Sequence, residues 1–167
     1  MRIWIRLFVI LWIIGLMAAG GYRNGVAAPV AGGIDLDAVF AKTNPRAVDI
    51  QSAVDLAVER LSAPQFADYK SRFKGKTVEW RGIVYDKAQH GGKVWVLVCT
   101  ACPNGVLTNY DTLFILPADG GADVKRGQEI GFRGDIEKVV GNPELGRMIG
   151  QGSIGYKVVL SGVRMQG

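Results

Sequence analysis

The chain has 167 residues, 49% of them hydrophobic, and a formal charge of +5. A chain of this length holds one folded domain with short appendages. Arg2, Arg6 and Arg23 lie in the N-terminal segment, and removing them from the 20 basic residues leaves 17 against 15 acidic ones, a formal charge of +2. Because the remaining charge is nearly balanced, a polyanionic partner such as nucleic acid is disfavoured.

The N-terminus predicts export. Two arginines precede residues 7–19, a run of 13 almost wholly apolar residues. Such a run has the size of a signal-peptide core and is short for a bilayer span of about 20 residues. Residues 1–27 are therefore predicted to be a signal peptide or a signal-anchor, and in the second case residues 3–21 give membrane association. Both alternatives place the domain outside the cytoplasm, in the periplasm or cell envelope, secreted across or anchored in the inner membrane.

Short helices are predicted before the main domain. Residues 28–50 read as a linker that contains one amphipathic helix, residues 34–42. Ser52 and Asp55 resemble a capping box for a helix over residues 53–61. The apolar stripe predicted for that helix comprises Val54, Ala57, Val58 and Leu61.

A second start signal follows at Ser62 and Gln65. Its helix is predicted to end at Gly75, a residue type favoured just beyond helix ends. The apolar face of this helix carries Phe66, Tyr69 and Phe73. We expect the helices of residues 51–75 to pack on the domain that follows.

Two stretches alternate strictly between apolar and polar residues. In residues 74–86, one face carries Val78, Trp80, Gly82 and Val84; in residues 129–137, one face carries Ile130, Phe132 and Ile136. A period of two predicts β-strands with one buried side. Gly82 and Gly134 stand in mid-strand, where glycine permits a sharp bend.

Three further strands are predicted. Residues 93–99 are β-branched and aromatic, residues 112–117 end at a proline, and residues 156–164 have Tyr156, Val158 and Leu160 on the inward face. The connections are predicted to be a turn and three loops, over residues 88–92, 100–111, 118–127 and 141–155. Five strands of this spacing predict a closed Greek-key barrel.

The chain resembles the OB-fold, and within it the small extracytoplasmic domains of the tRNA-anti-like type. The resemblance rests on three short segments within residues 66–165: Phe73-Lys-Gly-Lys76, Trp80-Arg-Gly-Ile-Val84 and Val124-Lys-Arg-Gly-Gln128. It implies a mainly β fold, a five-stranded OB-fold barrel over residues 76–167 preceded by short α-helices. The segments are turn and bend signals, so they imply no active site. The helix that many OB-folds insert between strands three and four is reduced here to residues 118–127.

The two cysteines, Cys99 and Cys102, are three positions apart. In an oxidising compartment they are predicted to form a disulfide. A thiol- or metal-handling role is the alternative, although Pro103 prevents the helix that activates thioredoxin-like cysteines. Tetrahedral zinc needs more ligands than this pair and His90 supply, so we expect no metal and no cofactor.

No nucleophile elbow, histidine–carboxylate pair or phosphate-cradling loop is recognisable, so the chain is not expected to be an enzyme. OB-folds bind oligonucleotides or oligosaccharides across strands two and three and the adjoining loops. On this chain that surface would comprise Arg81, Tyr85, Lys87, His90, Trp95, Asn142 and Arg147. The alternative for Trp95, as for Trp80, is a place in the barrel core.

The sequence thus predicts an exported, non-catalytic binding or assembly module that contacts an envelope protein or a glycan. A thiol- or metal-handling accessory based on Cys99 and Cys102 is the first alternative, and nucleic-acid binding is the second.

Overall fold

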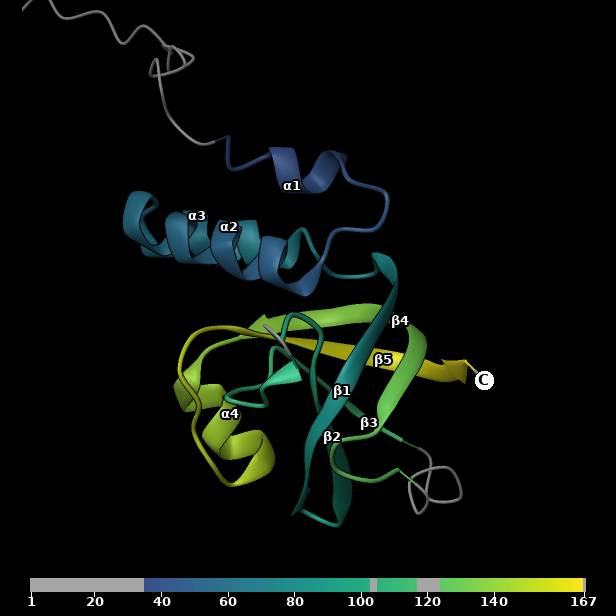
Figure 1. The fold of residues 1–167 in the computed structure, drawn as a ribbon. Helices are drawn as coiled ribbons and strands as arrows, with labels where there is room; N and C mark the ends of the chain where they lie inside the picture. Colours follow the sequence, from purple (N-terminus) through teal and green to yellow (C-terminus); the bar gives the residue numbers. More distant parts are fainter. Residues whose placement is uncertain (1–34, 103–104, 117–123, 167) are drawn as a thin grey trace, which may run out of the picture. The chain divides into compact units, whose positions relative to one another are not determined.

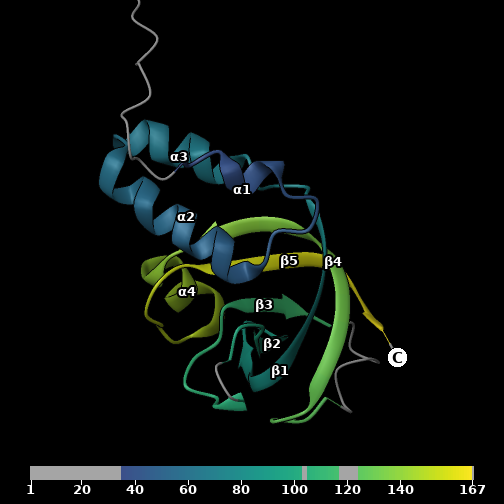
Figure 2. The ribbon, with the colours of Figure 1, turned by 45° about the horizontal axis from the view of Figure 1, so that its top comes forward.

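The computed structural model describes residues 35–102, 105–116 and 124–166. The predicted signal segment and the first part of the predicted linker lie outside these residues. Figures 1 and 2 show the described part from two directions.

Five strands close into a barrel in the order β1-β2-β3-β5-β4. They are β1 (Thr77–His90), β2 (Lys93–Cys99), β3 (Thr112–Ile115), β4 (Glu129–Val140) and β5 (Lys157–Gln166). The pairing of β3 with β5 is parallel, and every other pairing is antiparallel. A closed five-stranded mixed barrel preceded by short helices confirms the predicted architecture at this level, and the strand order is compatible with an OB-fold.

The alternation predicted in β1 and β4 is confirmed. In β1 the predicted inward residues are buried, and the residues between them up to Arg81 are exposed. In β4 the predicted inward residues are also buried, and they alternate with residues that are exposed or half-buried. Gly82 is needed because a Cβ there would lie 2.6 Å from Val98 Cγ1 and 2.7 Å from the Cys99 carbonyl oxygen. At Gly134 a Cβ would lie 2.8 Å from Val163 Cγ2. Both glycines allow the neighbouring strand to approach closely.

The first hairpin is tighter than predicted. β1 continues to His90, and the turn is reduced to Gly91 and Gly92, which have φ values of 58° and 73°. A shift in the pairing register between Val84 and Asp86 marks a β-bulge, which bends this long strand so that it pairs with β4 first and with β2 afterwards.

Three helices precede the barrel: α1 (Ala38–Ala41), α2 (Ala47–Arg60) and α3 (Ala63–Ser71). The predicted start of α2 at residue 53 is wrong, because Ala47 and Ile50 are already helical and fully buried. The capping carboxylate is Asp49, which accepts a hydrogen bond from the Arg46 backbone N–H at 3.2 Å. Val58 is 46% exposed and does not belong to the apolar stripe.

The start signal of α3 is confirmed. The Ser62 backbone N–H donates to Gln65 Oε1 at 3.1 Å, and Gly75 adopts a φ of 81° beyond the helix. Tyr69 and Phe73 are buried and their rings meet edge-on. The helices cover one side of the barrel, where α2 packs against β5 and α3 against β4 (Figures 1 and 2). Their apolar faces and the barrel interior form one core.

A fourth helix, α4 (Asn142–Ile149), replaces the predicted loop between β4 and β5. Pro143 stands in its first turn, where proline fits a helix, and Gly150 ends it with a φ of 74°. Leu145 and Ile149, one turn apart, are both buried. Gly141 and Gly150 therefore mark the two boundaries of a helix, and Gly146 lies within it.

The helix α4 forms a second core with the barrel. Leu145 and Ile149 pack with side chains on the face of β2, β3 and β5 opposite to the barrel interior. The strand residues in this second core include Trp95, Leu97, Leu113 and Val159. The barrel strands near α4 are therefore buried on both faces.

Candidate functional site

Part of the outer face of β2 is covered in this protein. The helix α4 lies in the connection between β4 and β5 and packs over Trp95 and Leu97 of β2. Trp95 is 7% exposed and belongs to this second core, whereas the barrel core expected as its alternative contains Trp80 and not Trp95. Tyr85 is half-buried beside it, with its ring 5.6 Å from that of Tyr110.

His90 and Asn142 lie at the two ends of α4. A Cβ on Gly150 would lie 3.0 Å from His90 Nδ1, so the imidazole packs against the end of the helix. Asn142 Oδ1 accepts a hydrogen bond from the Ser153 backbone N–H at 3.1 Å, which holds the segment after α4 against its start. Both side chains thus contact α4 or the segment that follows it.

The remaining predicted site residues are exposed. Arg81 lines a shallow hollow formed by β1, β4 and β5, while Lys87 and Arg147 stand at the surface of β1 and α4. The structure therefore distributes the seven predicted residues among the core under α4, the ends of α4 and separate exposed positions.

A different site lies beside the cysteine pair. A pocket of about 200 Å³ opens between α2, the segment that joins β2 to β3, and the start of β5. The polar and aromatic residues of its wall include Gln51, Asp55, Asn109, Tyr110, Tyr156 and Lys157. The sequence does not predict this pocket, because its walls come from segments far apart in the chain.

Lys157 is the most unusual of these residues, since its side chain is charged in water and is only 1% exposed here. Its Nζ donates a hydrogen bond to the Ile154 carbonyl oxygen at 2.6 Å and lies 5.1 Å from the centre of the Tyr110 ring. Within the described part of the chain, no carboxylate lies within ion-pair distance of this amine. Burial lowers the pKa of Lys157. The charges of Asp111 and Asp55 oppose that effect without cancelling it.

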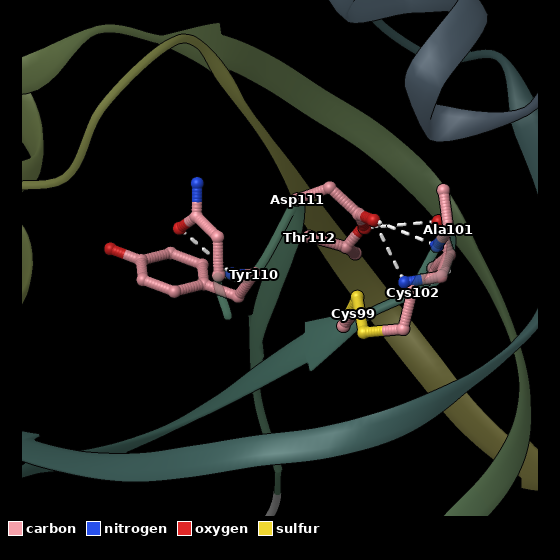
Figure 3. Close-up of a disulfide and its surroundings, with 8 residues drawn as sticks. Cys99, Ala101, Cys102, Tyr110, Asp111 and Thr112 are labelled. Atoms are coloured by element: carbon pink, nitrogen blue, oxygen red, sulfur yellow. Dashed lines mark hydrogen bonds between the residues drawn. A yellow bond between two sulfur atoms is a disulfide. The ribbon is translucent and has the colours of Figure 1, made fainter. Parts of the chain in front are cut away.

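Asp111 is buried nearby, and four hydrogen bonds occupy its carboxylate. Its Oδ2 accepts from the backbone N–H groups of Thr100 and Ala101 at 2.8 and 3.1 Å. Its Oδ1 accepts from the hydroxyl groups of Thr100 and Thr112 at 3.0 and 2.8 Å. Figure 3 shows Asp111 beside the disulfide, with its carboxylate directed toward Ala101. The carboxylate therefore fixes the segment after β2 and has no unused acceptor for Lys157.

The Cys99 and Cys102 sulfur atoms lie at disulfide distance, with a Cα–Cα separation of 5.6 Å. The predicted pairing of the two cysteines is confirmed. Cys99 ends β2 and also lines the pocket. The cysteine pair and Asp111 thus hold the same wall of the pocket.

The opposite wall comes from α2 and from the residue before β5. Gln51 Nε2 donates to the Tyr156 carbonyl oxygen, which leaves the amide oxygen of Gln51 for another donor. The Tyr156 ring meets Phe66 edge-on at 5.7 Å. Burial raises the pKa of the Asp55 carboxyl, with a smaller contribution from the charge of Glu59. Asp55 is nevertheless exposed, and the charge of Lys157 opposes the rise of its pKa.

One sequence signal could have indicated this site. Lys157 opens a strand whose next three residues are all apolar, which is typical of a strand covered on both faces. A lysine in such a segment must either reach the surface or be buried, and here it is buried.

Comparisons of the chain with protein-family models, with curated proteins and with solved structures find no match. No described helix has the length and apolar character needed to cross a membrane. No cluster of three or more histidine, cysteine or carboxylate side chains that could hold a metal occurs among the residues that the structure describes. The fold and the site define a small β-barrel protein with a polar pocket beside a cysteine pair.

Proposed function

We propose that this protein is an exported, non-catalytic binding module, an OB-fold barrel that holds the end group of an envelope glycan in the Lys157 pocket. The observation that carries the proposal is a small concave pocket that combines tyrosines with amide, carboxyl and amine groups. Sugars present hydroxyl groups that both donate and accept hydrogen bonds, so a wall of mixed polarity suits them.

The pocket offers several groups with unused hydrogen-bonding capacity. Asn109 Oδ1 accepts from the Ser153 hydroxyl and from the Tyr110 backbone N–H, which leaves its amide N–H groups for a ligand. The oxygen of the Gln51 amide and the carboxyl group of Asp55 supply acceptors. Ligand pockets for drug-sized molecules usually measure about 300–1,000 Å³. A volume of about 200 Å³ therefore suits one small end group.

The same geometry favours a glycan over an envelope protein at this site. A stable protein partner usually buries about 800 Å² on each side, which requires a broad surface. A narrow concave site provides little of that area. Nucleic acid is the weakest candidate, because α4 covers the strands that OB-folds use for it and the domain is nearly neutral.

The non-catalytic part of the proposal rests on the hydrogen bonds of the site. The Asp111 carboxylate already accepts four hydrogen bonds, so it has no free acceptor position with which to act as a base. His90 packs against Gly150 and does not line the pocket. Export is supported by the basic and apolar pattern of residues 1–27 and by a cysteine pair at disulfide distance.

The test is a calorimetric titration of the protein with chitobiose, a disaccharide of N-acetylglucosamine, and with maltose. Asn109→Ala removes an amide of the pocket and should weaken binding about tenfold, the value of one hydrogen bond to a buried ligand group. Arg147→Ala changes an exposed residue of α4 and should leave the affinity unchanged. Equal losses in the two variants, or no binding of either disaccharide to the wild type, would contradict the proposal.

A further inference from the structure

A buried amine without a counter-ion requires an explanation beyond packing. Lys157 is 1% exposed, and one carbonyl oxygen, that of Ile154, accepts from its Nζ. An isolated ammonium group at such a position loses most of its favourable hydration. The form of the Lys157 side chain that fits this burial is the neutral amine, which lysine adopts readily when it is buried.

The charges of the neighbouring carboxylates oppose the neutral form, but neither carboxylate forms an ion pair with the amine within the described residues. The four acceptor positions of Asp111 are filled by Thr100, Ala101 and Thr112. Asp55 lines the same pocket but forms no ion pair with Lys157 within the described residues. The amine therefore borders the pocket without a charged partner that would fix it as an ammonium group.

A neutral amine carries a lone pair, and a lone pair in a ligand pocket is a nucleophile. We infer that the Lys157 amine forms a reversible imine with the aldehyde or ketone group of a ligand that enters this pocket. This inference rests on the proposed function, because the ring-opened reducing end of a glycan carries an aldehyde.

The reaction balances without an oxidant or reductant. The lone pair of Nζ forms a bond to the carbonyl carbon, the electrons of the C=O π bond move to oxygen, and a proton passes from nitrogen to oxygen. The resulting hydroxyl group takes a second proton from the solvent and leaves as water as the C=N bond forms. The nitrogen then returns its remaining proton to the solvent, which gives a neutral imine and one molecule of water.

The experiment traps the imine in the wild-type full chain. Glycolaldehyde, the smallest hydroxyaldehyde, is added with sodium cyanoborohydride at neutral pH, and the modified lysines are identified by peptide mass spectrometry over time. Exposed Lys93 serves as the internal control in the same sample. Lys157 should be modified faster than Lys93, because burial lowers the pKa of Lys157 and so raises the fraction of its amine that is neutral.

Unfolding the protein in denaturant before the reaction should abolish the difference, because the effect belongs to the folded pocket. A Lys157 that reacts no faster than Lys93 in the folded protein would overturn the inference. Lys157→Arg keeps a cation but cannot form an imine, and it should lose the adduct at this position while the other lysines react as before.

The chitobiose titration separates this inference from the proposed function. Binding of chitobiose without preferential trapping at Lys157 overturns the inference and leaves the glycan-binding proposal standing. Preferential trapping of glycolaldehyde at Lys157 without chitobiose binding supports a reactive lysine and overturns the glycan as its ligand.

Discussion

The buried carboxylate of Asp111 determines the local structure on one side of the pocket. It accepts four hydrogen bonds, two from backbone N–H groups and two from hydroxyl groups. Each hydrogen bond to a charged group contributes about 1.5–3 kcal/mol, and a buried donor that loses its acceptor costs about 1–3 kcal/mol. Asp111 is therefore the single side chain on which the segment after β2 most depends.

Asp111→Asn should lower the free energy of unfolding by about 2–3 kcal/mol, because an amide N–H₂ group replaces one acceptor oxygen. Chemical denaturation measures the difference. Asp86→Asn is the matched control: Asp86 is exposed and its carboxylate accepts from the Lys87 backbone N–H, so the change should remain within about 0.5 kcal/mol. Similar values for the two variants would contradict the role assigned to Asp111.

Asp49 gives a pH-dependent prediction. The side-chain hydrogen bond from Arg46 holds the pKa of this carboxyl well below its usual range, and Lys42 adds a smaller effect. A lowered pKa in the folded state stabilises the fold above the unfolded pKa of about 3.9, and the stabilisation is lost as the pH falls below that value. Asp49→Asn should lower the free energy of unfolding by about 1 kcal/mol at pH 7. The effect is modest because both cations are largely exposed, and the difference between wild type and variant should shrink below pH 4. A constant difference between pH 7 and pH 2.5 in urea unfolding would show that charge plays no part.

At the scale of the elements, α4 decides which face of the barrel is available. It turns the outer face of β2 into a second core, so Trp95 and Tyr85, two of the residues expected to bind a ligand, pack instead. The pair Gly146 and Gly150 allows this helix to be tested without touching its buried side chains. Gly146 lies inside the helix with open space around it, whereas Gly150 has a φ of 74° and faces His90.

Gly150→Ala should lower the free energy of unfolding by about 1–2 kcal/mol, because an L-residue is strained at positive φ and the new Cβ contacts His90. Gly146→Ala should raise it by about 0.5–1 kcal/mol, the helix propensity of alanine over glycine. Thermal unfolding of the two variants measures both. Shifts in the same direction would contradict the helical assignment of residues 142–149.

The elements that the sequence predicts correctly are those with a local signal. The period of two in β1 and β4, and the Ser62–Gln65 pair before α3, depend on neighbouring residues alone. The helix α4 was missed because its glycines resemble a loop, and its stability comes from Leu145 and Ile149 packing on strands far away in the chain. The pocket was missed for the same reason, since Lys157 is buried by α2 and by the segment after β2.

At the scale of the whole molecule, the described barrel with its two cores carries a polar pocket whose wall is held by Asp111 and the cysteine pair. The disulfide closes a very short loop, so its contribution to the free energy of unfolding should be about 2 kcal/mol or less. The protein should retain its fold after reduction, because the cores do not depend on this link.

A thiol titration checks the state of the cysteine pair. The native protein isolated without reductant should show no reactive thiol, and two thiols should appear after treatment with dithiothreitol. Thiols that react in the untreated native protein would favour the alternative role as a thiol-handling accessory.

If the pocket beside the cysteine pair is the ligand site, a bound sugar must perturb its residues. A chitobiose titration followed by the backbone amide NMR signals of the isotope-labelled protein tests this. We expect the largest shifts at Gln51, Asp55, Asn109 and Lys157, with little change at Arg81 or Arg147. Shifts concentrated on the exposed face around Arg81, or no shifts at all, would contradict it.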